Sequence, residues 1–222
     1  EKLLQTEDGE GLEQVFVHGA NLLGDLGTHT LLTIPVGLAR SPAAGALEDA
    51  YGTATRVVPA ARIPSFLQGK CLAEELTEAW VMFRDLVAVR LPGGTTLEDA
   101  FDAPETLDAM IALSGGHPRR LLSLLRETTL YVDEFPLTGE DFEEVRKETI
   151  RAAARQISRD AELEVVAHVA HTHQLPSDDE AHATAMLLLQ NLHLLSYHNS
   201  LEYYGPSPAL LGVPAVMSAI RE

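Results

Sequence analysis

Two adjacent arginines, Arg119 and Arg120, occupy the position in this chain that is best suited to chemistry. They follow the run Ser-Gly-Gly-His-Pro, whose proline, Pro118, is typical of a first helical turn, where a missing N–H breaks no hydrogen bond. A helix start is positive, so a cation there is disfavoured by about 0.3–1 kcal/mol. An anion reverses this cost, because free N–H groups, the helix dipole and a guanidinium together bind phosphate. The pattern therefore indicates a phosphate site.

The same pattern also has a purely structural interpretation. One or both arginines can fold back onto acids such as Asp108 or Glu105. Arg120 points about 100° away from Arg119 around the helix, so we expect Arg120 to form a structural ion pair. Arg119 is the arginine that we assign to the anion.

A small helical bundle is predicted to position these arginines. Gly115 can take the left-handed conformation that closes a helix ending at Ser114, and residues 118–131 form the next helix. Residues 71–90 carry an apolar stripe at helical spacing. Further helix starts are predicted at capping boxes. These are Thr95-x-x-Glu98, Asp102-x-x-Glu105 and Thr138-x-x-Asp141, the last of which opens a helix to about Ile157.

The N-terminal third differs from the bundle because it contains strand-like runs. Residues 9–26 have the spacing of an amphipathic helix. Residues 30–36 are apolar and β-branched without polar alternation, which predicts a strand covered on both faces of a parallel sheet. Residues 39–54 are expected to form a loop with a helical turn. Residues 55–63 are expected to form an edge strand, because Pro59 cannot donate to a sheet ladder.

The C-terminal third predicts two helices followed by a hairpin. Asp160 and Ser177-x-x-Glu180 are suited to capping the two helices. Residues 192–197 and 201–204 are strand-like runs around the turn-rich residues 198–200. This order is typical of a small winged-helix type of domain. The tyrosines of the hairpin could stack on bases, but we expect them to fill its apolar face. They are Tyr197, Tyr203 and Tyr204.

Composition excludes several classes of protein. The 222 residues include 16 basic and 33 acidic side chains, a net charge of −17. Residues 158–222 alone carry 2 − 8 = −6. A chain this acidic is a poor stand-alone nucleic-acid binder, because phosphate neutralisation needs basic side chains. Cys71 is the single cysteine, so no internal disulfide can form. No apolar run has the length of a membrane span and the first residues lack a signal-peptide pattern, so we expect a soluble, cytoplasmic protein.

Other patterns that could support chemistry are weaker. His168-x-x-His171-x-His173 brings imidazoles close to one helical face, a spacing that can bind a metal. Its alternative is a polar helix end, and we expect no metal. Arg40 is conceivable as an arginine finger, but we expect it to be an ordinary surface arginine. No Gly-x-Ser-x-Gly elbow occurs.

Taken together, the chain resembles the C-terminal part of an AAA+ ATPase of the bacterial STAND-like kind. In that family a polar sensor 1 residue near the γ-phosphate ends a core strand, which corresponds to Thr33. The sensor 2 arginine lies in a Gly-x-x-Arg at the start of a lid helix, which matches Gly116-His117-Pro118-Arg119. The resemblance implies ATP as the cofactor, bound near Arg119, Thr33, Gly116 and Pro118. It also implies a protein partner or a homo-oligomer.

The chain departs from the family at two features that hydrolysis needs. It contains no Gly-x-x-x-x-Gly-Lys-[Ser/Thr] to hold the β- and γ-phosphates, and no apolar strand ending in Asp-Glu before residue 30 to hold Mg²⁺. In the family both lie upstream of the segment equivalent to 9–26. We therefore expect a fragment that does not hydrolyse ATP and binds no cofactor alone, and that is part of an ATPase only if an upstream P-loop segment belongs to the full protein.

The expected fold is mostly α with some β. It comprises a remnant of a parallel αβα P-loop core at 1–70, a helical lid at 71–157 and a winged-helix-like domain at 158–222. The expected function is to sense bound ATP through the lid and to couple it to conformational change or assembly. The alternative is a non-catalytic adaptor, in which the helices and the winged-helix-like domain bind a protein partner and the arginines are structural.

Overall fold

A computed structural model describes residues 14–20, 32–34, 36–39, 43–56, 60–61, 63, 73–132, 134–157, 159–199 and 201–221. The chain divides into two compact units. Unit 1 comprises residues 1–58 and 186–191, and unit 2 comprises residues 59–185 and 192–222. Unit 2 thus contains all of the residues predicted as the lid (71–157) and, except for 186–191, those predicted as the winged-helix-like domain (158–222).

Unit 1 has a small apolar core between short helical segments. They are the π-helical turn η2 (Gln14–His18), α3 (Val36–Ala39) and α4 (Ala44–Tyr51). Leu38 and Leu47 are buried, and partly buried side chains pack around them. The hydroxyl of Tyr51 donates to the carbonyl oxygen of Phe16 at 2.9 Å, which ties α4 to η2. Gly52 takes a left-handed conformation (φ 62°) and ends α4.

The strands predicted for the N-terminal third are not found among its described residues. Residues 32–34 have no regular secondary structure, and α3 begins at Val36. Pro35 explains this, because a proline cannot donate to a sheet ladder but suits the start of a helix. Residues 54–56, 60–61 and 63 are likewise irregular. The segment predicted as a loop with a helical turn contains the helix α4, which is longer than predicted, at two turns. The rest of the predicted helix 9–26 lies outside the described residues.

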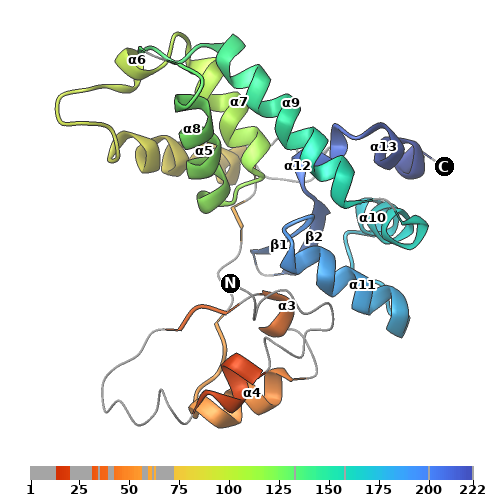
Figure 1. Cartoon of the computed structure of the whole chain (residues 1–222). Helices are drawn as coiled ribbons and strands as arrows, with labels where there is room; N and C mark the ends of the chain where they lie inside the picture. The colour runs from red at the N-terminus through yellow and green to blue at the C-terminus, as the bar shows by residue number, and fades with distance from the viewer. Residues whose placement is uncertain are drawn as a thin grey trace. The chain divides into compact units, whose positions relative to one another are not determined.

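Unit 2 is built of helices and one hairpin (Figure 1). Its helices in the predicted lid are α5 (Ala73–Ala88), α6 (Leu97–Ala100), α7 (Pro104–Ser114), α8 (Pro118–Thr129) and α9 (Gly139–Gln156). The remaining elements are α10 (Asp160–Thr172), α11 (Asp179–Gln190), β1 (Leu194–Asn199), β2 (Leu201–Pro206), α12 (Pro208–Leu211) and α13 (Pro214–Arg221). Residues 186–190 of α11 belong to unit 1.

The bundle packs around α7, which neighbours α5, α8, α9 and α12. Apolar side chains at helical spacing on these elements are buried, as the pattern predicts. They include Phe83, Val87, Met110, Ile111, Leu121, Leu124, Phe142 and Val145. A short parallel bridge between Phe101 and Leu137 joins the segments that precede α7 and α9. The predicted helical bundle is therefore present.

Capping side chains were predicted correctly for one helix and shifted for the others. Thr138 and Asp141 form the predicted capping box of α9. The box of α6 uses Thr96 and Asp99, one residue later than predicted. Adjacent side chains with similar capping chemistry explain the shifts at α6 and α11, because spacing alone does not separate them. At α7, Asp102 accepts from the Thr106 hydroxyl at 2.6 Å, while Ala103 is the residue that precedes the helix. Asp160 lies inside α10. At α11, Asp178 takes the place predicted for Ser177.

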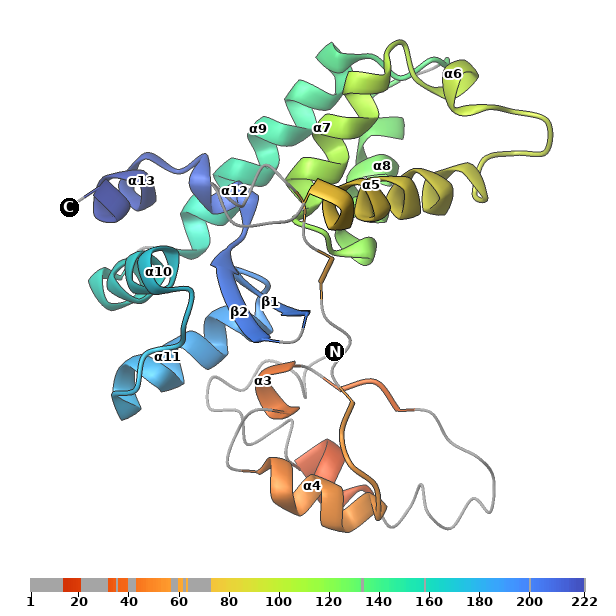
Figure 2. The same cartoon turned by 180° about the vertical axis from the view of Figure 1, so that it is seen from behind.

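The C-terminal part of unit 2 has the predicted order of two helices and a hairpin (Figure 2). The antiparallel register pairs Tyr197 with Tyr203 and Leu194 with Pro206. Helix α10 packs against both α13 and β2. Tyr197 and Tyr204 are buried, as expected for tyrosines that fill an apolar face.

The structure is mostly helical with a small two-stranded antiparallel sheet, which confirms the coarse fold class. The described residues contain no parallel sheet, so the remnant of a P-loop core stays a prediction. Among the helices that the structure describes, none combines the length and the apolar character needed to cross a membrane.

Candidate functional site

The candidate site is the junction between α7 and α8, and its backbone follows the sequence prediction closely. Gly115 closes α7 in the left-handed conformation (φ 65°), and Pro118 opens α8 after an extended His117. Gly116 also has a positive φ of 76°. Two successive left-handed glycines turn the chain between the helices almost without a loop. The free N–H groups of the first turn of α8 therefore begin directly after this turn.

Gly116 is required by a close approach as well as by its conformation. The backbone N–H of Ala61 donates to the carbonyl oxygen of Gly116 at 2.9 Å. A Cβ atom on Gly116 would lie only 1.6 Å from the carbonyl oxygen of Ala61. The segment at residues 60–61 thus lies directly against the junction. The sequence predicts Gly116 as a site residue, but no local pattern indicates this contact with residue 61.

The hairpin supports the junction on another side. The Tyr197 hydroxyl donates to the carbonyl oxygen of Gly115 at 3.0 Å, and the Tyr197 side chain is only 1% exposed. A Cβ atom on Gly115 would meet Leu195 Cδ1 at 2.5 Å. The backbone N–H of Ala60 also donates to the carbonyl oxygen of Ser196 at 3.1 Å. Strand β1 therefore holds both the junction and the segment that crosses it.

Arg119 lies at the second position of α8, where its side chain is exposed. It forms no ion pair or hydrogen bond with any residue that the structure describes. Asp108, which could have neutralised it, binds Arg84 instead through bonds of 2.7 and 2.8 Å. The structural interpretation, in which Arg119 folds back onto Asp108, is therefore not what the structure contains. A guanidinium at a positive helix start is left open to solvent.

Arg120 has the structural role that its helical position predicts, but with a different partner. Its Nη1 donates to the carbonyl oxygen of Leu192 at 3.3 Å. The expected ion pair is absent among the described residues, and a backbone carbonyl takes the place of a carboxylate. Leu192 has a positive φ of 58°, which is uncommon for a leucine. Arg120 thus connects the start of α8 to the residue pair that precedes β1.

Two histidines beside these arginines were not identified from the sequence. Burial, together with the charges of Arg119 and Arg120, lowers the pKa of His117, whose Nδ1 is buried without a hydrogen-bond partner among the described residues. Burial and the charge of Arg120 also lower the pKa of His193, against an opposing effect of Glu162. Both imidazoles are therefore uncharged at neutral pH, and the positive charge at the junction comes from the arginines. The sequence signal that could have pointed to His117 is its place at the N-cap of α8.

The four predicted site residues divide between the two units. Gly116, Pro118 and Arg119 are brought together at the junction in unit 2. Thr33 belongs to unit 1, where it is exposed and lies outside regular secondary structure.

The histidine pattern of α10 does not form a metal centre. His173 ends the helix with a positive φ of 58°, and its ring stacks on Tyr203 with the centroids 4.2 Å apart. Its Nε2 lies 3.1 Å from the Tyr203 hydroxyl. Within the described part of the chain, no group of three or more His, Cys, Asp or Glu side chains could hold a metal ion. The third member of the pattern is thus engaged by the hairpin.

No family model, no curated protein and no solved structure matches this chain in comparisons with known proteins.

Proposed function

We propose that this chain is the nucleotide-sensing part of an AAA+/STAND-like ATPase, and that Arg119 is the residue that contacts the nucleotide phosphates. One observation carries the proposal. Arg119 is exposed at the positive end of α8 and unpaired among the described residues, while Asp108, an acid that the sequence offered as its partner, is bound to Arg84. A cation held at a positive helix start is favourable once a phosphate lies beside it.

The surroundings of Arg119 fit a phosphate group. His117, whose pKa is lowered by burial and by the two arginines, adds no positive charge, so a phosphate would be held by Arg119 and the N–H groups of the first turn of α8. Bound ATP would supply a charged γ-phosphate whose loss on hydrolysis changes the charge beside α8. The proposal also requires a phosphate-binding loop and an acid that holds Mg²⁺, and these 222 residues contain no motif for either.

The contacts of the junction support a coupling between nucleotide and C-terminal elements. Tyr197 holds the carbonyl of Gly115, and Arg120 holds the carbonyl of Leu192. A rotation of α8 on phosphate release would therefore pull on β1 at Tyr197 and on the residue pair that precedes β1. Sensing at Arg119 would in this way drive conformational change or assembly with a protein partner or further copies of the chain.

The test is a thermal shift measured on a chain that includes the residues encoded immediately before Glu1. With Mg-ATP at about 100 times Kd, binding to the folded state stabilises by about 2.7 kcal/mol. That corresponds to a rise in Tm of about 5–10 °C for a protein of this size. Arg119→Ala should lower the ATP affinity about tenfold or more, because charge-assisted hydrogen bonds to phosphate are lost.

Arg126→Ala is the matched control, because it removes an exposed arginine from the last turn of the same helix. It should leave the ATP-dependent shift unchanged. An equal shift in wild type and Arg119→Ala would contradict the proposed role. No shift in any of the three proteins, with a stable partner co-purifying, would favour the alternative of a non-catalytic adaptor.

A further inference from the structure

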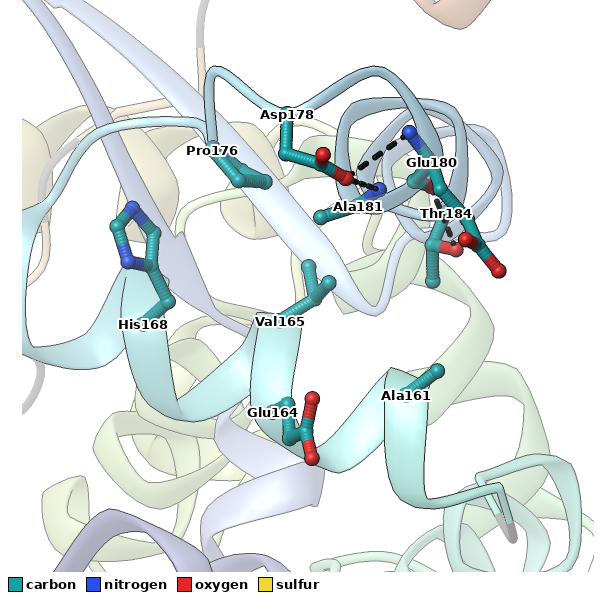
Figure 3. Close-up of a pocket in the computed structure, with 9 residues that line it drawn as sticks. All are labelled: Ala161, Glu164, Val165, His168, Pro176, Asp178, Glu180, Ala181 and Thr184. Carbon is teal, nitrogen blue, oxygen red and sulfur yellow. Dashed lines mark hydrogen bonds between the residues drawn. The ribbon is translucent and has the colours of Figure 1, made fainter.

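A groove between α10 and α11 is a second feature of unit 2, separate from the junction (Figure 3). Its volume is about 350 Å³. Val165 and Pro176, which line it, are buried, and the small side chains of Ala161 and Ala181 add apolar surface. Figure 3 shows the residues of α10 along one side, and along the other the segment that leads into α11 together with the first turns of α11.

The polar residues of the groove are mainly acidic. Glu164, Asp178 and Glu180 line it, and no lysine or arginine does. None of these three carboxylates forms an ion pair with a described residue. Asp178 is fixed in place because its Oδ1 accepts from the backbone N–H groups of Glu180 and Ala181 at 3.1 and 3.0 Å. The groove therefore combines an apolar lining with carboxylates that no described cationic side chain pairs with.

A metal ion does not match the arrangement of these three carboxylates. The carboxylates do not belong to any group among the described residues that could hold a metal ion. They are distributed around an apolar surface instead, which suits a long side chain with an apolar stem and a cationic end. Arginine fits best, because its guanidinium is less strongly hydrated than an ammonium group and can bind carboxylates through several N–H donors.

We propose that the groove between α10 and α11 receives an arginine side chain from a protein partner. The stem of the arginine packs on Val165 and Pro176, and its guanidinium binds Glu164 and Glu180. Charge complementarity selects this occupant, since residues 158–222 carry a net charge of −6. The inference does not depend on nucleotide binding at Arg119.

The probe for the test is the capped tripeptide acetyl-Ala-Arg-Ala-amide, titrated into the 222-residue protein and followed by amide NMR shifts. Saturable shifts are expected at residues 161–168 and 176–184. The affinity should fall as salt is raised. Glu164→Gln/Glu180→Gln should weaken binding about fivefold, since each exposed charge pair contributes modestly.

Glu98→Gln/Glu140→Gln is the control, because it removes two exposed acids from the first turns of α6 and α9. It should bind the probe as tightly as wild type. Equal weakening in both double variants would overturn the proposal in favour of unspecific attraction to an acidic protein. Equal binding of the lysine or the uncharged citrulline tripeptide would also overturn it, because the groove would then not select arginine.

Discussion

The hydroxyl of Tyr197 donates a hydrogen bond to the carbonyl oxygen of Gly115, a residue 82 positions earlier in the chain. This bond joins the hairpin to the turn that precedes Arg119. The Gly115 carbonyl belongs to the end of a helix, where the last carbonyl groups lack partners within the helix. Tyr197 therefore satisfies a buried acceptor and holds the junction of α7 and α8 at the same time.

Tyr197→Phe should lower the free energy of unfolding by about 1–3 kcal/mol, because the ring remains but a buried carbonyl loses its donor. Urea unfolding followed by circular dichroism measures this change. Tyr131→Phe is the control, since Tyr131 is 59% exposed and should be near neutral. Equal stability of Tyr197→Phe and wild type would show that the hydrogen bond contributes nothing.

Gly116→Ala should be more damaging than any other substitution at the junction. The new Cβ would lie 1.6 Å from the carbonyl oxygen of Ala61 at a φ of 76°, so the segment at 60–61 must move. We expect a loss of at least about 2 kcal/mol. Gly93→Ala is the control, because nothing lies within 4 Å of its added Cβ. A Tm within error of wild type for Gly116→Ala would contradict this contact.

The two adjacent arginines should differ in their effect on stability. Arg119→Ala should be neutral or stabilising by up to about 1 kcal/mol, because it removes an exposed cation from a positive helix start. Arg120→Ala should cost about 1–2 kcal/mol, since a hydrogen bond from a charged group is lost. Chemical denaturation of both variants measures the difference. The reverse order would mean that Arg119 has a structural partner.

Stability should fall on acidification through the titration of His117 and His193. Burial and the neighbouring arginines lower the pKa of both in the folded state, whereas the unfolded value is about 6.5. Below about pH 6.5 the unfolded chain takes up protons that the folded chain does not, so the free energy of unfolding decreases. Above about pH 7.5 both states are neutral and the effect disappears.

Unfolding curves between pH 5.5 and pH 8 measure this dependence. Most carboxylates stay ionised across this range, because their ordinary pKa values are about 4. His193→Gln should flatten the pH dependence, because it removes one of the two groups. His171→Gln, at an exposed position, is the control. If His193→Gln keeps the wild-type slope, His193 is not a source of the pH dependence.

Helix ends could be predicted where local chemistry was unambiguous. Gly115 and Pro118 mark the end of one helix and the start of the next, and the structure has both boundaries as predicted. Caps were shifted where similar residues are adjacent, as with Thr95 and Thr96. The strand predicted at 30–36 was wrong for its described residues, because an apolar run with a proline also fits a chain entering a helix.

By itself, the sequence determined the helical bundle, the hairpin, the acidic balance and the place of Arg119 at a helix start. These follow from spacing within a few residues or from composition. Only the tertiary structure decided that Arg120 binds Leu192, that Tyr197 binds Gly115 and that Ala61 lies against Gly116. Such contacts join residues far apart in the chain, and local propensity contains no information on which distant backbone groups will meet when apolar faces pack.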